Sequence, residues 1–554
     1  MIRRIASLSV LFVLLLSVFV APQRAARAAT TAAPTPTLIA EVNGSGKGRV
    51  WVGAVPANSS TKPVLVFVHG LHGKAPGWWG ATEYYGTNDM YDRAYGSGYR
   101  TAFVSLDDEV DGPASSVWAN GATLNRQLDV ILAYYGVSSV NIVAHSKGGV
   151  DTNSALVHYG ASPKIQKIVT LSSPHRGSQL ADLAYSWWAG WLASLLGQKD
   201  DGTYTMQTGY MSYFRSVTDG RPEYNNVRFY TSGGTHHGPW FSAMWFGGGY
   251  LPGDNDGVVT VSSSHHPQQY SRLFTSGSLN HDNIRKGSDV WSLIEPTLRT
   301  GFRSGATTAS DTTGKANKTP VEATAQQPSA MILRGGELAN GAGSASLPVE
   351  GGVRAVTFDL LASRNDVAVT FVAPDGARYA ASAPVADAEG VFRGAFHYTA
   401  QVQQPRSGAW SVEMKGAAGT GYMLVASLDS GLTVALDRPN AQAAASSQIQ
   451  FSVQARSANG ADAEVKLDAA LSGTPVGREK ASDLPTQLKA SANGKGRASA
   501  ALTAPAATGL YQVGLTVTGV AADGTAFERS FATNLPVISQ AKGKQPALDL
   551  PAGR

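Results

Sequence analysis

The sequence VNIVAHSKGGVD, residues 140–151, places a serine at the point where an apolar run gives way to two glycines. The run Val140–Ala144 is typical of a buried strand, and the residues after Ser146 are typical of a helix start. A nucleophile on a sharp strand-to-helix turn needs small residues two positions before and after it, because strand and helix nearly collide there. Ala144 and Gly148 meet that requirement. The alternative is an ordinary strand-to-helix connection that happens to contain serine.

Strand-like and helix-like segments alternate on both sides of this motif. The runs VLVFVHG (64–70) and YRTAFVSL (99–106) are apolar and rich in β-branched residues. The segment NGATLNRQLDVILAYYG (120–136) has apolar residues at helical spacing and ends at glycine. Strands that are buried on both faces and separated by helices form parallel sheets. We therefore predict an α/β domain for residues 38–303, with a mostly parallel sheet and helices on both faces.

The composition changes after this region, and a chain of 554 residues is too long for a single core. Residues 304–330 are rich in Gly, Ser, Thr and Ala, which predicts a linker crossed by few contacts. Short alternating strands separated by turn sequences then predict two β-sandwiches, at 331–431 and, Ig-like, at 432–541. Residues 542–554 form a polar tail.

Residues 1–28 have the organisation of a secretory signal peptide. The basic MIRR precedes an apolar run, LSVLFVLLLSVFV, that is short for a membrane span, and ARA offers small residues for cleavage. A membrane anchor is the alternative. The sequence contains no cysteine, which excludes disulfides and thiolate chemistry. Its formal net charge of +5 includes no long block of like charge, so nucleic-acid binding gains no support. We expect a secreted protein.

The segment VFVHGLHG (66–73) ends a predicted strand in a His-Gly turn. In acyl transfer by serine, a backbone N–H from such a turn and the N–H of the residue after the serine form an oxyanion hole. We predict that the backbones of Leu71 and Lys147 supply these donors, and that His69 and His72 order the loop. A glycine turn without function is the alternative.

A nucleophilic serine also needs a base and an acid, which we expect in the chain order serine, acid, histidine. Asp256 of PGDNDGVV precedes a β-branched run and can aim a carboxylate across the top of a sheet, and Asp254 is the alternative acid. His281 lies in a polar loop before a predicted helix and is the expected base. Four other histidines fit the order less well: His265 and His266 follow the acid too soon, and His236 and His237 precede it.

The motifs VNIVAHSKGGVDT, LSSPHRGSQLADL, DNDGVV and NHDNI resemble the secreted bacterial true lipases of the α/β-hydrolase fold. The resemblance covers roughly residues 62–298 and implies a triad of Ser146, Asp256 and His281. It also implies a calcium ligand two residues after the histidine. Here Asp282 comes one residue after it and Asn283 follows, so we expect no metal or other cofactor, with calcium as the open alternative. The sequence SGAWSVEMKG, by contrast, resembles sandwich domains appended to secreted bacterial hydrolases.

The predicted function is therefore hydrolysis of carboxylic esters by a lipase or esterase through an acyl-enzyme. The expected partner is a lipid or ester substrate at a lipid–water interface, without a stable protein partner. One alternative is a polyester depolymerase that docks through its sandwiches. Another is a surface binding protein with an inert hydrolase domain. The segment Leu180–Gly197 carries a wide apolar stripe with three tryptophans, which predicts either a lid or a core helix.

Overall fold

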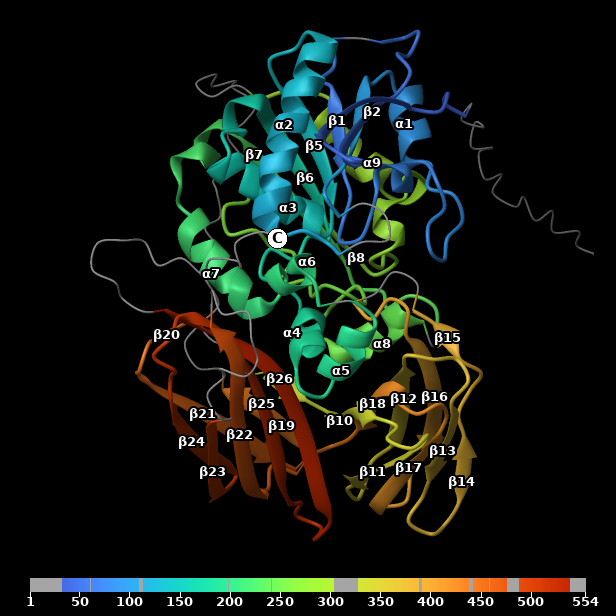
Figure 1. Ribbon diagram of the computed structural model, residues 1–554, viewed down its shortest axis with the longest axis vertical. Coiled ribbons are helices and arrows are strands. Elements are labelled where there is room, and N and C mark those ends of the chain that lie inside the picture. Colours follow the sequence, from blue (N-terminus) through green and yellow to red (C-terminus); the bar gives the residue numbers. More distant parts are fainter. Residues whose placement is uncertain are drawn as a thin grey trace, which may run out of the picture.

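The computed structural model describes residues 32–302 and 327–538, apart from gaps at 60, 109–112, 198, 241, 388–390, 438–441, 458 and 476–487. The expected signal peptide, most of the expected linker and the tail lie outside the described residues. An α/β domain forms the upper part of the molecule in Figure 1, and two β-sandwiches lie side by side beneath it. No helix among the described residues is long and apolar enough to cross a membrane.

The sheet of the α/β domain has eight strands in the order β1-β2-β4-β3-β5-β6-β7-β8. The β1–β2 and β2–β4 pairs are antiparallel, and the other pairs are parallel. The strands are β1 (Thr37–Gly44), β2 (Lys47–Val52), β3 (Leu65–Val68), β4 (Thr101–Ser105), β5 (Val140–His145), β6 (Ile165–Leu171), β7 (Arg228–Gly234) and β8 (Ser271–Ser276). This sheet confirms the predicted α/β class.

Helices cover both faces of this sheet, as the two-sided burial of its strands requires. Val66 and Val68 of β3 pack in one core with α2 (Val117–Tyr135) and α3 (Lys147–His158). The alternate residues of β3, Leu65 and Phe67, pack in a second core with α1 and α9. Other helices of this domain are α1 (Met90–Gly96), α6 (Asp201–Thr205), α7 (Thr208–Thr218), α8 (Ala243–Tyr250) and α9 (Gly287–Leu298).

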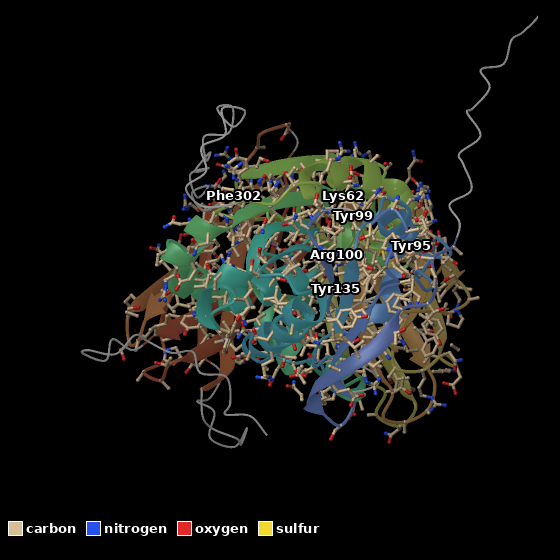
Figure 2. All side chains as sticks on the ribbon, turned by 90° about the horizontal axis from the view of Figure 1, so that it is seen from above. Lys62, Tyr95, Tyr99, Arg100, Tyr135 and Phe302 are labelled. Atoms are coloured by element: carbon tan, nitrogen blue, oxygen red, sulfur yellow. The ribbon has the colours of Figure 1, made fainter. Side chains whose placement is uncertain are left out.

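The amino ends of the central strands lie on the side of the α/β domain that faces away from the sandwiches (Figure 2). There Lys62 Nζ lies 4.5 Å from the centre of the Tyr99 ring, and the Arg100 guanidinium lies 5.7 Å from that of Tyr135. The carboxyl ends of the parallel strands therefore point toward the sandwiches. In open α/β sheets, ligands bind at those carboxyl ends.

The first sandwich packs a sheet ordered β10-β18-β12-β16-β15 against one ordered β11-β17-β13-β14. The stacked rings of Phe358 and Phe371, next to the buried Trp410, fill its core. Its strands are β10 (Met331–Glu337), β11 (Ala342–Val349), β12 (Ala355–Ala362), β13 (Ala368–Val372), β14 (Arg378–Ala380), β15 (Val385–Ala386), β16 (Phe396–Gln403), β17 (Gly408–Lys415) and β18 (Gly421–Asp429). The predicted division near residue 431 falls just after β18.

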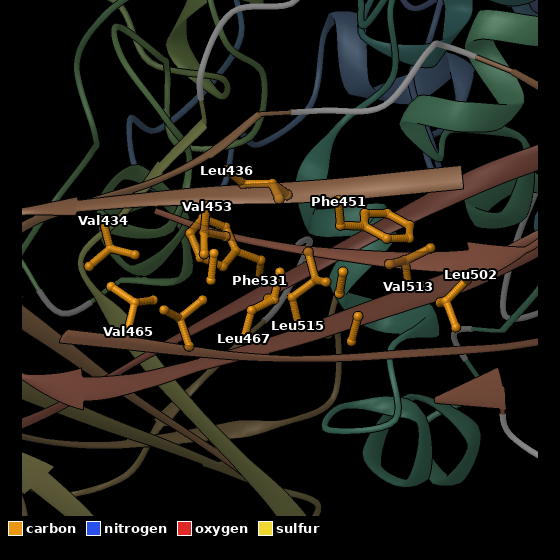
Figure 3. Packing of buried hydrophobic residues seen from close by; sticks show 14 of the residues in the cluster. Val434, Leu436, Phe451, Val453, Val465, Leu467, Leu502, Val513, Leu515 and Phe531 are labelled. Atoms are coloured by element: carbon orange, nitrogen blue, oxygen red, sulfur yellow. The ribbon is translucent and has the colours of Figure 1, made fainter. Parts of the chain in front are cut away.

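The second sandwich packs a sheet ordered β24-β21-β19-β9 against one ordered β20-β26-β25-β22-β23. Figure 3 shows its core, in which Phe451, Leu515 and Phe531 lie between the sheets. Its strands are β9 (Gln327–Ser329), β19 (Thr433–Asp437), β20 (Ala443–Ala444), β21 (Gln448–Arg456), β22 (Glu464–Pro475), β23 (Leu488–Lys495), β24 (Arg497–Thr503), β25 (Gly509–Val520) and β26 (Ala526–Ile538). The last residues of the predicted linker form β9, which pairs with β19.

The tryptophan segment Leu180–Gly197 is neither an open lid nor a single core helix. It contains most of α4 (Gln179–Tyr185) and all of α5 (Gly190–Leu195), and Ser186, which caps α4, donates its N–H to the Leu183 carbonyl oxygen. Its apolar side is buried against the first sandwich in one shared core: Leu183, Trp188 and Leu192 with Leu333, Phe392, Met423 and Val425. The expectation of few contacts between the domains is therefore wrong, because the sandwiches cover this apolar stripe.

The second sandwich also contacts the α/β domain, through apolar and polar side chains. Tyr210 and Phe214 of α7 share a core with Leu510. The Asn534 side chain donates to Asp182 Oδ1 at 2.6 Å and accepts from the Gly209 N–H at 2.6 Å. These buried hydrogen bonds between side chain and backbone of the two domains favour one relative position of the domains.

Candidate active site

The turn between β5 and α3 holds Ser146 in a strained conformation, with φ 52° and ψ −133°. A non-glycine residue adopts such a positive φ only at a cost, which the surrounding structure must offset. Small neighbours make the turn possible, since a Cβ on Gly148 would lie 2.2 Å from the His69 carbonyl oxygen. The structure therefore has the sharp turn that the sequence around Ser146 predicts.

Ser146, His281 and Asp256 form a continuous set of contacts. His281 Nε2 lies 2.9 Å from Ser146 Oγ, and His281 Nδ1 lies 2.9 Å from Asp256 Oδ2. The other carboxylate oxygen of Asp256 accepts from the N–H groups of Val258 and Val259, at 3.0 and 2.7 Å. Asp256 is fully buried, so these backbone donors and the imidazole hold its carboxylate in one orientation.

The structure separates the two candidate acids. Asp254 is exposed, while its carbonyl oxygen accepts from the Val261 N–H. Asp256, not Asp254, contacts His281. Of the other histidines, His266 is buried against Arg215 and Phe229.

The loop after β3 approaches the nucleophile closely. A Cβ on Gly70 would lie 2.6 Å from the Ser146 Cβ, so only glycine fits there. His69 orders the loop: its Nδ1–H donates to the Gly70 carbonyl at 2.7 Å, and its Nε2 accepts from the Leu106 N–H at 2.9 Å. Lys147 is the first residue of α3, where a backbone N–H has no acceptor within the helix.

The predicted oxyanion residues, Leu71 and Lys147, both line the cavity that contains Ser146. Stabilisation of an oxyanion would require their N–H groups to lie about 2.7–3.1 Å from the developing charge.

Sequence reasoning missed His145. Its Nε2 lies 2.8 Å from the His281 carbonyl oxygen, and the two ring centres are 4.7 Å apart. Burial, with the nearby His281 and Arg285, holds the pKa of His145 well below its ordinary value. The ring is therefore neutral and donates through Nε2–H to the backbone of His281. Its position next to the serine was the only sequence signal.

The lipase resemblance implies a calcium ligand two residues after the histidine, and Asp282 is the acidic residue next to that position. Its carboxylate is bound by other protein groups. One carboxylate oxygen lies 2.8 Å from Arg285 Nη2, and the other accepts from the Tyr84 N–H at 2.9 Å. Among the described residues, no cluster of three histidine, aspartate or glutamate side chains could hold a metal ion. The geometry at Asp282 is that of an ion pair that fixes the loop after His281.

The cavity around Ser146 has a volume of about 570 Å³ and is lined by two domains. Apolar side chains of the α/β domain, Leu180, Met244 and Phe246, form part of its wall. Val391, Phe392 and Arg393 of the first sandwich also line it. The sequence did not predict this sandwich contribution, because Val391 lies 245 positions after Ser146 and no local pattern links them.

Comparisons with known proteins agree with this fold. A family model described as a PGAP1-like alpha/beta domain matches residues 59–186. Triacylglycerol lipase 2 of Saccharomyces cerevisiae is 29% identical over 191 residues, which cover 32% of this chain and 57% of the yeast protein. A triacylglycerol lipase of Burkholderia plantarii is 29% identical over 129 residues, covering 23% of this chain and 34% of that protein. The chain thus spans between about a third and just over half of these curated relatives.

A solved structure matches most of the chain. The crystal structure of Bacillus licheniformis lipase BlEst2 in propeptide form has a TM-score of 0.69 and 26% identity, and covers 90% of this chain and 100% of that one. The α/β domain described here is therefore an α/β-hydrolase domain. The curated relatives are named triacylglycerol lipases, and this chain carries additional β-rich domains on the C-terminal side of the α/β-hydrolase domain.

Proposed function

We propose that the protein hydrolyses carboxylic esters with Ser146 as nucleophile, His281 as base and Asp256 as the acid that orients it. The observation that carries this proposal is the set of contacts from Ser146 Oγ through both nitrogens of His281 to the buried Asp256. Serine alone is a weak nucleophile, and an adjacent oriented base activates it.

In the proposed mechanism, His281 Nε2 takes the Ser146 proton as Oγ attacks the ester carbonyl. The N–H groups of Leu71 and Lys147 stabilise the oxyanion, at about 3–4 kcal/mol per donor in comparable sites. His281 then donates the proton to the departing alcohol, which leaves an acyl-enzyme on Ser146. Water, deprotonated by His281, releases the acid. Asp256 keeps the proton on Nδ1 and stabilises the imidazolium.

We propose a lipid ester as the substrate class. The apolar wall of the cavity supports this choice, and the curated relatives are named triacylglycerol lipases. We propose that the reaction uses side chains and backbone groups of the protein alone, without a metal. We further propose that residues 1–28 direct secretion, in keeping with their signal-peptide pattern.

Turnover of three substrates by the wild type and Ser146→Ala tests the proposal: soluble short-chain p-nitrophenyl ester, emulsified triacylglycerol and polyester film. The wild type should hydrolyse the first two, and the variant should lose on the order of 10⁶-fold in kcat. A strong preference for the film would favour the depolymerase alternative. Undiminished turnover by Ser146→Ala would refute the assignment, and a wild type without turnover would favour the inert binding protein.

For the C-terminal domains we propose a covering role. Phe392 is 2% exposed and forms part of the wall of the cavity, and the sandwiches bury the apolar stripe around Trp188. An apolar stripe beside a lipase site is suited to contact a lipid surface once it is uncovered. The similar Bacillus lipase structure, which matches 90% of this chain, is described as a propeptide form, and this is consistent with a removable C-terminal region here.

Cleavage of the intact protein tests this role, at a specific protease site placed between residues 305 and 326. A scrambled, uncleavable site in the same place is the control. After cleavage and separation of the sandwiches, activity on emulsified long-chain ester should rise more than activity on soluble ester. Added sandwiches should reverse the gain. A folded α/β-hydrolase domain that loses activity on both substrates would mean that the sandwiches complete the site instead.

A further inference from the structure

The residue that follows the nucleophile has a completely buried ammonium group. Lys147 is 0% exposed, and its Nζ lies 2.9 Å from Asp151 Oδ1, one helical turn along α3. The same Nζ lies 3.3 Å from Asp108 Oδ2, in the loop after β4. The proposed reaction uses only the backbone N–H of Lys147, so the mechanism leaves this buried ion cluster without a role.

The cluster continues across the carboxyl end of the sheet. Asp108 Oδ1 accepts from the Ser115 N–H at 2.7 Å and from Asn120 Nδ2 at 2.8 Å. The neighbouring Ala114 N–H donates to Asp200 Oδ2 at 2.8 Å. These bonds tie α3, the loop after β4 and the start of α2 to the segment that precedes α6.

The far end of the network reaches the second proposed oxyanion residue. The Asp200 carboxylate oxygen that accepts from Ala114 also lies 2.7 Å from His72 Nε2. His72 follows Leu71 directly and has a φ of +53°, so its backbone is strained as that of Ser146 is. The side chain of Lys147 is thus linked to the residue beside Leu71 through Asp108, the adjoining backbone of Ser115 and Ala114, and Asp200.

We propose that this buried network, defined by Lys147, Asp108, Asp151, Asp200 and His72, positions the two backbone donors of the oxyanion hole relative to each other. Lys147, Asp108 and Asp151 fix the start of α3, and His72 and Asp200 fix the loop that carries Leu71. The inference rests on the proposed serine-hydrolase function and adds positioning residues to it. None of the five side chains has to touch the reacting atoms for the network to act.

Stability alone is a weak reason for such a cluster. Removing charges from water costs several kcal/mol per ion, and well-packed apolar replacements of buried ion pairs are often equally stable or more stable. Burial raises the pKa of Asp151 to about 7, against the attraction of the Lys147 ammonium, which shows that the cluster holds its charges at a cost. Donor placement matters, because oxyanion donors act only at about 2.7–3.1 Å from the developing charge.

The test compares three full-length variants. Lys147→Met removes the ammonium but keeps the backbone N–H and the length of the side chain. Asp108→Asn keeps the ammonium but must turn an amide N–H₂ toward either Lys147 or Ser115, both of which are donors. Lys167→Met is the matched control, since Lys167 is 7% exposed and its Nζ bonds Thr297 and Thr300, near the amino end of β6. Thermal unfolding, kcat, KM and the affinity for an alkylboronic acid are measured for each at about pH 8, above the pKa of Asp151.

Both network variants should lower kcat at least about tenfold, which is less than the 10²–10³-fold for complete loss of a donor. Boronate affinity should fall by a similar factor, because the boronate adduct carries the tetrahedral anion, and KM should change by less than about twofold. The control should keep wild-type values of all three. If Lys147→Met does not fold, Asp108→Asn decides alone.

Wild-type kcat and boronate affinity in a folded network variant would overturn the inference. So would equal losses in the Lys167→Met control. Failure of the underlying function has a different result, because Ser146→Ala would then retain turnover and the boronate would not bind even the wild type.

Discussion

The geometry around Asp256 predicts the outcome of Asp256→Asn in detail. In the wild type, the N–H groups of Val258 and Val259 donate to one carboxylate oxygen, and His281 Nδ1–H donates to the other. Asparagine keeps one acceptor oxygen, which the two backbone donors require. Its amide N–H₂ group must therefore face His281 Nδ1, and the imidazole proton moves to Nε2.

With the proton on Nε2, His281 points a donor at Ser146 Oγ and cannot accept the serine proton. The expected fall in kcat is about 10⁴-fold, or about 5 kcal/mol of activation free energy. The fold should stay intact, because both backbone N–H groups keep their acceptor. KM should change little, since Asp256 is fully buried.

The matched control is Asp254→Asn, two residues away on the same turn. Asp254 is exposed, and its backbone carbonyl, which the substitution leaves in place, accepts from Val261. Its kcat should stay within about twofold, as surface substitutions rarely exceed about 0.5 kcal/mol. Initial rates on soluble p-nitrophenyl ester and thermal unfolding measure both variants. An Asp256→Asn enzyme within tenfold of the wild type, or a larger loss in Asp254→Asn, would refute the reasoning.

Three further outcomes are expected. His145→Leu should lower kcat by roughly tenfold with little change in KM, because the hydrogen bond that holds the His281 backbone is lost; an unchanged kcat would assign His145 to packing alone. Because burial raises the pKa of Asp151 to about 7, the native state binds a proton that the unfolded chain releases at about pH 4. The unfolding temperature of the wild type, compared with that of Asp151→Asn, should therefore fall as pH rises from about 4 to about 7. A difference between the two that does not vary with pH would contradict this. Burial lowers the pKa of His397, but the carboxylates of Asp359 and Asp387 outweigh burial and raise this pKa to about 10. The stability that the wild type has over His397→Gln should therefore be complete below about pH 6.5 and lost toward about pH 10. Loss of this stability on acidification instead would show that His397 is neutral in the folded protein.

Local patterns were sufficient to predict the α/β domain and the contacts at its centre. The β-branched runs around Val66 and Val143 carry their own periodicity, and the strain at Ser146 follows from small residues within two positions of it. The order of serine, acid and histidine then limited the choice to a few residues. The sequence favoured Asp256 over Asp254, but the physical reason, a carboxylate held by the backbone of Val258 and Val259, is visible only in the structure.

The missed features depend on contacts between distant parts of the chain. The stripe around Trp188 has the periodicity of either a lid or a core helix, and only its burial against Leu333 and Met423 shows that the sandwiches cover it. Lys147 has one local partner, Asp151, one helical turn away, but its other partner, Asp108, lies 39 positions away and nothing in the sequence links the two. Tertiary packing of this sort has no local signal.

The most direct test of the account is the site of covalent labelling by a fluorophosphonate, read by mass spectrometry of the digested protein. We expect one adduct, on Ser146, and a labelling rate that falls together with kcat in Asp256→Asn. The intact protein should be labelled more slowly than the protein cleaved between residues 305 and 326. Labelling at another serine, or an adduct on Ser146 that forms as fast when Asp256 is replaced, would contradict the central claim.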